Sequence, residues 1–237
     1  MYRGPLIGVC ISLLAVAAFA NDPLPYLTGP GSARGGGAGH NNTDDVLVDN
    51  LCTSVSEISK ALYGAAASYN SWVAFDYTPD KAVKINKLWF HYVYNTTTTK
   101  STLNFRLYRG ANPGTGSIVR SWDVPTSNYN EVNTGWIYGT RAVYRAEVTI
   151  PDQDLTAKIK YWFAYRSATT STSNALYWCV RKDSVKEEEV WWYLYGAWKT
   201  AQGHDPTLGR VEQSYKIEGV LSGIAPTSFG KVKTLFH

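Results

Sequence analysis

The sequence predicts an all-β protein, folded as a two-sheet antiparallel β-sandwich that is jelly-roll-like and has at most one short helix. Apolar side chains recur at every second residue along most of the chain, which is the spacing of strands with one buried face. About ten such segments follow one another, with short polar or Gly/Pro-containing links between them. No alternation of strands with long helices is visible, so we exclude a parallel sheet with crossover helices. A concanavalin-like sandwich is the alternative topology.

Two segments without a strand pattern precede the predicted sandwich. Residues 1–20 hold Arg3, an apolar stretch and the small-residue ending Ala18-Phe19-Ala20, which together are typical of a cleaved signal peptide. The apolar stretch is shorter than the ~20 residues that a membrane-spanning helix needs. Residues 21–43 are rich in Gly and Pro and are expected to form a flexible linker. We therefore expect no membrane span after signal removal, and secretion to the extracellular space or the cell envelope.

The rest of the chain is expected to comprise the sandwich domain, residues 44–222, and a C-terminal tail, residues 223–237. A short alternating strand over residues 45–50 opens the sandwich. Residues 54–64 then carry apolar side chains at helical spacing and a Ser-x-x-Glu capping box, so one short helix is predicted there. A continuous loop is the alternative for this segment. Residues 71–78 resume the strand pattern.

The longest alternation of apolar side chains lies within residues 81–109. A strand is expected over residues 81–94, with a bulge at Asn86 and Lys87, where the alternation shifts by one residue. Residues 103–109 resume the pattern after a Thr-rich turn, so we predict that the two segments are neighbouring antiparallel strands. Residues 110–116 are rich in Gly but lack the Lys-Ser/Thr pair and the helix of a phosphate-binding loop. They are predicted to form a hairpin turn.

The remaining predicted strands come at regular spacing, with a polar loop at residues 125–134 between the first two. They cover residues 117–123, 141–150, 157–167, 175–180, 188–198 and 214–221. No internal repeat is visible, and one sandwich of this length commonly remains a single domain.

Two cysteines remain once the predicted leader and its Cys10 are removed. Cys52 and Cys179 form an even pair in an oxidising compartment, which favours a disulfide between them. Such a bridge would close a long loop and contribute about 4 kcal/mol to stability. The alternative is two separate buried thiols.

Several segments resemble a known group of proteins. Their order is VDN, SWVAFDYTPDKAVKINKLWFHYVY, LNFRLYRGANPGTGSIVRSW, YRAEVTI and KYWFAYR. Over residues 46–180 this order resembles the secreted β-sandwich domains of bacterial envelope and extracellular proteins. The resemblance implies a jelly-roll-like fold and extracellular residence, and it implies no catalytic residue. The final segment, SFGKVKTLFH, is similar to short aromatic-Gly-basic tails at the C-terminus of some secreted bacterial proteins.

Aromatic residues carry the leading functional hypothesis. In a strand over residues 188–198, Trp191, Tyr193 and Tyr195 share one face and Trp192 lies on the other. One face must pack inward, so the other presents rings that can stack on sugars. We predict a non-catalytic module that binds a polysaccharide, a cell-surface glycan or another surface ligand through exposed aromatics. Further candidates for ligand binding are Trp89, His91 and Trp136.

Two other functional classes compete with this hypothesis. If both faces of the aromatic strand are covered, the chain is a structural or envelope interaction protein without a small ligand. A polysaccharide-active glycosidase or lyase would need two carboxylates, and Glu187 and Glu189 lie two apart on one strand face. Adjacent glutamates are more typical of a solvated strand end, so we expect both to be exposed. No histidine pairs with a neighbouring nucleophile, and no G-x-S-x-G or H-E-x-x-H motif is present, so no catalytic residue is predicted.

Charge and oxygen-bearing side chains limit the partners. The net charge of +4 is small and no basic run is present, so nucleic acid is not an expected partner. We expect no cofactor, with a structural calcium ion as the one exception considered. Its ligands would be Asp44, Asp45, Asp49, Asn50 and Glu218. Their spacing matches no calcium-loop motif, so solvated acids are the alternative, and the oligomeric state is not predicted.

Overall fold

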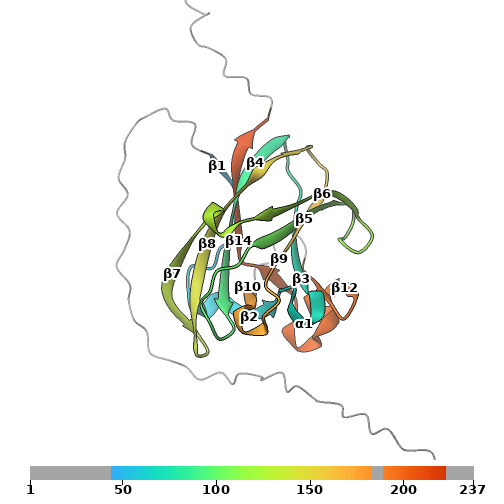
Figure 1. The fold of residues 1–237 in the computed structure, drawn as a ribbon. Coiled ribbons are helices and arrows are strands. Elements are labelled where there is room, and N and C mark those ends of the chain that lie inside the picture. Colours follow the sequence, from blue (N-terminus) through green and yellow to red (C-terminus); the bar gives the residue numbers. More distant parts are fainter. Residues whose placement is uncertain (1–43, 183–188, 223–237) are drawn as a thin grey trace, which may run out of the picture. The chain divides into compact units, whose positions relative to one another are not determined.

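The computed structural model describes residues 44–182 and 189–222 of the chain. The predicted signal peptide, linker and C-terminal tail lie outside these residues. Two antiparallel β-sheets pack face to face around a common core (Figure 1). The predicted fold class, a two-sheet antiparallel sandwich, is confirmed. Within the described residues, no helix has the length and apolar character needed to cross a bilayer.

The first sheet has eight strands and is built on one long strand. This central strand is β4, Val83–Tyr94, which pairs with β8 along one edge and with β14 and β10 along the other. The other strands are β1 Asp45–Asp49, β2 Ile58–Tyr63, β7 Tyr129–Tyr138, β8 Arg141–Leu155, β10 Leu176–Lys182, β13 Val211–Gln213 and β14 Tyr215–Leu221. The ladder of β4 shifts register between Ile85 and Lys87, which confirms the predicted bulge.

The second sheet has six strands, all antiparallel. Their order across the sheet is β12 Ala197–Thr200, β11 Trp191–Leu194, β3 Trp72–Tyr77, β9 Tyr161–Ser167, β5 Leu103–Arg109 and β6 Ser117–Val124. The predicted hairpin at residues 110–116 joins β5 to β6.

Helices contribute little in the described part of the chain. There are single turns of α-helix and of 3-10 helix: α1 Ala67–Asn70, α2 Ala201–His204, η1 Val55–Glu57, η2 Thr126–Asn128, η3 Thr172–Asn174 and η4 Pro206–Leu208. The helix predicted at residues 54–64 is wrong. Glu57 instead accepts the Thr53 N–H at 3.0 Å, which closes one turn, and the following residues form β2 along β10. Strand pairing and burial of Leu62 therefore override the helical spacing.

Two strands predicted to be neighbours lie in different sheets. β4 and β5 were expected to pair, but β5 pairs with β6 and β9. Their apolar faces meet across the core, where the rings of Phe90 and Phe105 are 6.3 Å apart. Alternation assigns a face to a strand but no partner, and this is why the expected pairing is wrong.

Two further differences concern the strand that carries Trp136 and the aromatic strand. Trp136 lies in β7, which begins inside the expected polar loop at residues 125–134. The strand predicted over residues 188–198 is split into β11 and β12 by a tight turn. Tyr195 and Gly196 form this turn with φ angles of 54° and 81°. Two consecutive positive φ angles are typical of a type I′ hairpin.

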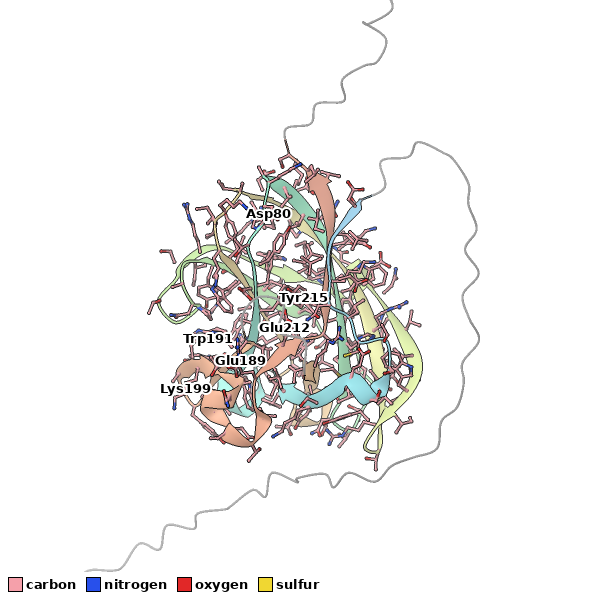
Figure 2. The ribbon with its side chains drawn as sticks, turned by 180° about the vertical axis from the view of Figure 1, so that it is seen from behind. Asp80, Glu189, Trp191, Lys199, Glu212 and Tyr215 are labelled. Carbon is pink, nitrogen blue, oxygen red and sulfur yellow. The ribbon has the colours of Figure 1, made fainter. Side chains whose placement is uncertain are left out.

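Large aromatic rings fill the space between the sheets. Phe75 stacks on Tyr215 with ring centroids 4.0 Å apart, and Tyr165 contacts Trp178 at 4.5 Å. Tyr215 lies in the middle of the sandwich (Figure 2). The Trp178 Nε1–H donates to the carbonyl of Gly64 at 3.2 Å, so this buried polar atom has a partner. These rings pack against the inner face of the six-stranded sheet, so its other face is directed away from the core.

Candidate functional site

The outer face of the six-stranded sheet carries a cluster of aromatic side chains. In β3, alternate residues such as Val73 and Phe75 enter the core, while Trp72 and Ala74 face outward. We call the outward aromatic cluster the aromatic platform. It consists of Trp72, Tyr108, Trp162, Trp191, Tyr193 and Trp198. Its members come from β3, β5, β9, β11 and β12, so the sheet ladder holds them in place.

The floor of the platform is buried although it faces away from the core. Trp72 is 3% exposed and Trp162 is 0% exposed. Trp162 donates its Nε1–H to the carbonyl of Gly110 at 3.2 Å, and Trp191 packs edge-on against it with centroids 6.0 Å apart. The floor is therefore a fixed layer on which other rings rest.

The rim of the platform is formed by Trp191, Tyr193 and Trp198, which are partly exposed. In the ladder, Tyr193 is opposite Trp72 on one side and Trp198 on the other. The rings of Tyr193 and Trp198 are 5.5 Å apart at an interplanar angle of 60°. The rim rings are thus adjacent but tilted, and they do not form one flat row.

The structure separates the aromatic residues predicted to share the face of one strand. Trp191 and Tyr193 lie on the platform, and Figure 2 shows Trp191 at this part of the molecule. Trp192 points to the other side and donates its Nε1–H to the carbonyl of Tyr63 at 2.8 Å. Tyr195 is 73% exposed, but it belongs to the turn after β11 and not to the platform.

Two arginines border the platform. Arg106 of β5 and Arg166 of β9 each place the guanidinium carbon 4.3 Å from the centroid of the Trp72 ring. Arg166 donates its Nε–H to Asn104 Oδ1 at 3.1 Å, and Asn104 donates to Asp123 at 2.7 Å. Burial and the neighbouring Arg106 lower the pKa of Arg166. The site therefore combines stacking rings with guanidinium groups and an amide.

The predicted candidates Trp89, His91 and Trp136 lie on the eight-stranded sheet, away from the platform. His91 is 2% exposed, its Nδ1 lies 2.8 Å from Ser214 Oγ, and its ring is 5.2 Å from that of Trp136. Burial, assisted by Arg145, lowers the pKa of His91 to about 4. His91 cannot reach a ligand in this position, so its predicted binding role is wrong. Trp136 packs against the same small cluster.

Trp89 is partly exposed on that sheet, and cations lie near its ring. Lys216 Nζ is 4.7 Å and the Arg145 guanidinium carbon is 5.3 Å from the ring centroid. Within the described part of the chain, Trp89 is therefore a single ring with charged neighbours and has no aromatic ring beside it.

The predicted disulfide is wrong. Cys52 and Cys179 are both buried free cysteines. They pack in the small cluster on the eight-stranded sheet, where burial raises the pKa of both thiols. A reduced thiol behaves as a small apolar side chain, which suits this setting.

The predicted calcium ligands have other partners. Asp44 lies 3.6 Å from Lys87 Nζ, Glu218 is paired with Lys216, and Asn50 donates to the carbonyl of Gln213 at 2.9 Å. Across residues 44–182 and 189–222, no group of three or more His, Cys, Asp or Glu side chains could hold a metal ion. The expected calcium site, which also included Asp45 and Asp49, is therefore not formed.

The paired glutamates proposed for catalysis are only partly described. Glu187 lies outside the described residues. Glu189 was expected at an exposed strand end, but it is 8% exposed and accepts the Gln202 N–H at 2.7 Å. That expectation is wrong for Glu189, because its carboxylate is buried against the first turn of α2, where it accepts a backbone N–H.

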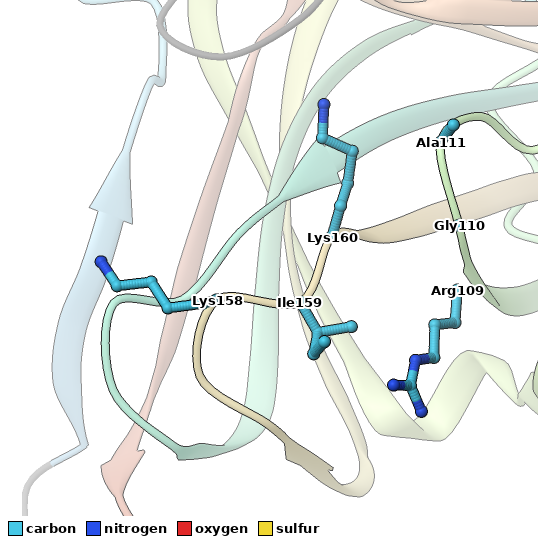
Figure 3. Close-up of a pocket in the computed structure, with 6 residues that line it drawn as sticks. All are labelled: Arg109, Gly110, Ala111, Lys158, Ile159 and Lys160. Carbon is cyan, nitrogen blue, oxygen red and sulfur yellow. The ribbon is translucent and has the colours of Figure 1, made fainter.

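A cavity of about 450 Å³ lies beside the segment that precedes β9 and the start of the β5–β6 turn. Its lining includes the cationic side chains of Arg109, Lys158 and Lys160. Figure 3 shows that these three side chains point in different directions. They do not converge on one ligand group, so we place the candidate site on the platform instead.

Sequence reasoning missed four of the six platform residues, Trp72, Tyr108, Trp162 and Trp198. Trp72 and Trp162 occupy strands whose other alternate residues are apolar, and neither of them was assigned a role from the sequence. Their signal is that Ala74 and Ala164 follow two residues later on the same face, followed by Asp76 and Arg166. A strand that enters the core with one face and carries charges on the other points to a solvent-side cluster.

Comparisons with known proteins assign no family to the chain. No protein-family model and no curated protein matches it. Among solved structures, it is similar to the family 3a carbohydrate-binding module from the cipA scaffolding of Clostridium thermocellum. That match has a TM-score of 0.29 and 18% identity, covering 60% of this chain and 97% of that chain. A CBM3a-L domain with flanking linkers from scaffoldin cipA of the same organism gives a TM-score of 0.28 and 16% identity, covering 69% and 93%. Likeness this distant carries no argument, so the bacterial domain family and the extracellular location remain predictions.

Proposed function

We propose that the chain is a non-catalytic module that binds a polysaccharide or a cell-surface glycan through the aromatic platform. One observation carries this proposal: Trp191, Tyr193 and Trp198 are adjacent and partly exposed above a floor of buried indoles. Rings on the solvent side of a sheet add nothing to the core between the sheets. Aromatic faces stack on the apolar CH faces of sugars, and the neighbouring polar groups can bond hydroxyls.

The tilt of the rings bears on the kind of glycan. A flat crystalline polysaccharide surface would need coplanar rings, whereas Tyr193 and Trp198 are inclined by 60°. Tilted rings suit the successive, twisted sugar units of a single chain. We therefore propose a soluble or surface-displayed glycan chain as the ligand.

Alanine variants on a glycan panel test the proposal. The full chain is run in affinity gels that contain soluble neutral and acidic polysaccharides, alone and with the variants Trp191→Ala and Tyr193→Ala. Each lost ring should weaken binding about tenfold, because a stacked aromatic contact contributes up to ~1.5 kcal/mol. The double variant should migrate as if no polysaccharide were present.

The control variant is Trp89→Ala, because Trp89 is also a partly exposed tryptophan but lies on the other sheet. It should bind like the unaltered chain. Melting temperatures measured beside the gels separate lost binding from unfolding. Retention by none of the glycans would count against the proposal and for a structural or envelope interaction role.

A further inference from the structure

We infer that the glycan is acidic, a polysaccharide of uronic acids whose carboxylates are bound by Arg106 and Arg166; this inference rests on the proposed function. It rests on the placement of these two side chains beside the rim rings. It also rests on the scarcity of other charge partners for them among the described residues.

Arg106 and Arg166 converge on one indole. Each guanidinium carbon lies 4.3 Å from the Trp72 ring centroid. In the ladder, Arg106 is opposite Ala164 and Arg166 is opposite Asn104, so the arginines are diagonal neighbours on adjacent strands. Diagonal neighbours are about 7–8 Å apart at the backbone, and long side chains on such positions can reach one ligand group.

These cations have little compensation within residues 44–182 and 189–222. Among these residues, the Arg106 side chain forms no hydrogen bond and no ion pair. Its one contact of another kind is the cation–π contact with the Trp72 ring. Arg166 Nη1 is buried without a hydrogen-bond partner. The carboxylate that acts on Arg166, Asp123, accepts a hydrogen bond from Asn104.

The electrostatics agree with this geometry. The neighbouring Arg106 helps burial to lower the pKa of Arg166, and Asp123 opposes that shift in part. Two like charges held on one ring repel each other, and an anion between them would relieve the repulsion. An anionic group on the ligand therefore supplies the negative charge that the described residues do not place between Arg106 and Arg166.

A uronic acid matches both parts of the surface. Its pyranose ring has apolar faces for the rim rings, and its planar carboxylate accepts two parallel N–H bonds from a guanidinium fork. Tyr193 is opposite Trp72 in the ladder, so the stacking residues directly adjoin the arginine pair. Single-stranded nucleic acid shares stacking and negative charge, but the net charge of only +4 without a basic run favours the polysaccharide.

The test compares one polymer with and without its charges. Binding of the full chain to polygalacturonate and to its fully methyl-esterified form is measured by titration calorimetry. The unaltered chain should bind the acid at least about tenfold more tightly than the ester, because hydrogen bonds to charged groups are the stronger ones. The double variant Arg106→Gln/Arg166→Gln should bind both forms equally.

Two further variants serve as controls. Arg109→Gln removes an exposed arginine from the same strand, β5, at a position of the opposite alternation, and should keep the preference for the acid. Arg106→Lys keeps the charge but loses the planar fork, so its preference should lie between those of the unaltered chain and the double variant.

The outcomes separate this inference from the function on which it rests. Equal binding of acid and ester by the unaltered chain would overturn the uronate inference and leave glycan binding intact. Binding of no neutral or acidic glycan would overturn both. Tighter binding of a sulfated polysaccharide or of single-stranded DNA than of polygalacturonate would also reject the uronate assignment.

Discussion

The outer faces of the two sheets carry similar residue types in different surroundings. On the six-stranded sheet, the rim rings Trp191 and Tyr193 stay partly exposed. On the eight-stranded sheet, His91 of β4 and Cys179 of β10 also face away from the main core, but both are buried. Residues 51–57 and β7 pack over them. An outward position in a strand therefore stays accessible only where no other segment covers it.

Residues 51–57, which cover this face of the eight-stranded sheet and are called the cover below, are attached to it by polar contacts. Arg181 of β10 donates to the carbonyl of Leu51 at 3.2 Å and pairs with Glu57 at 3.2 Å. The Cys52 N–H donates to Ser214 Oγ at 2.9 Å. At the platform, the carbonyl of Gly110 in the turn between β5 and β6 accepts the Trp162 Nε1–H at 3.2 Å, but Trp191, Tyr193 and Trp198 remain partly exposed. This difference in exposure distinguishes the two faces.

The largest expected effect is a difference in stability between variants of two arginines, one on the outer face of each sheet. Arg181→Met should lower the free energy of unfolding by about 3 kcal/mol, because several partly buried partners lose their donor. Arg106→Met should lower it by less than about 1 kcal/mol, since its recorded contact is the stack on Trp72. Urea denaturation of both variants measures the difference. Equal losses would mean that the cover is not held as described.

The second prediction concerns the loss of stability in acid that the buried His91 causes on the covered face. Burial and Arg145 lower the pKa of His91 to about 4, while Asp49 and Glu57 act in the opposite direction. The unfolded chain, with an ordinary histidine pKa near 6.5, binds the proton more readily than the folded chain. The stability that His91 contributes is therefore fully present above pH 6.5 and is lost as the pH falls toward 4. The total is about 3 kcal/mol, with a slope up to about 1.4 kcal/mol per pH unit.

Denaturation curves at several pH values check this dependence. His91→Gln should show a flatter change in stability between pH 4 and pH 6.5 than the unaltered chain. Parallel curves for the two proteins would show that His91 does not couple the fold to pH. The platform contains no histidine, so glycan binding should not follow the same profile.

A smaller effect on stability is expected when a buried tyrosine hydroxyl is removed from the inner face of each sheet. Tyr165 of β9 is fully buried and its hydroxyl has no hydrogen-bond partner within the described residues. Tyr165→Phe should therefore raise stability by about 1 kcal/mol. Tyr215 of β14 donates to the carbonyl of Asp76 at 3.3 Å, so Tyr215→Phe should lower stability by a similar amount. Opposite signs in thermal unfolding support the assignment, and a loss in both variants contradicts it.

Much of the fold was predictable because the strand period is short and regular. The bulge at Asn86 and Lys87 could be placed from a one-residue shift in alternation. The partner of residues 103–109 could not, because period two assigns faces and not neighbours. The helix at residues 54–64 failed for a similar reason, since spacing alone cannot weigh pairing with β10.

The candidate site was predictable only in part. Alternation correctly put Trp191 and Tyr193 on one face and Trp192 on the other. It could not bring Trp72 and Arg166 beside them, because strands far apart in sequence meet only through the sheet order. Alternation also could not show that Trp89 is partly exposed while His91 is buried, since the segment that covers His91 lies elsewhere in the chain.

Nuclear magnetic resonance of the indole N–H groups tests the central claim most directly. The chain contains 9 tryptophans, distributed over the platform, the core and the opposite sheet. On titration with the polysaccharide that binds best in affinity gels, the signals of Trp191 and Trp198 should shift, while those of Trp89, Trp136 and Trp178 should stay. Shifts confined to Trp89 or Trp136 would place binding on the other sheet and contradict the assignment of the aromatic platform as the binding site.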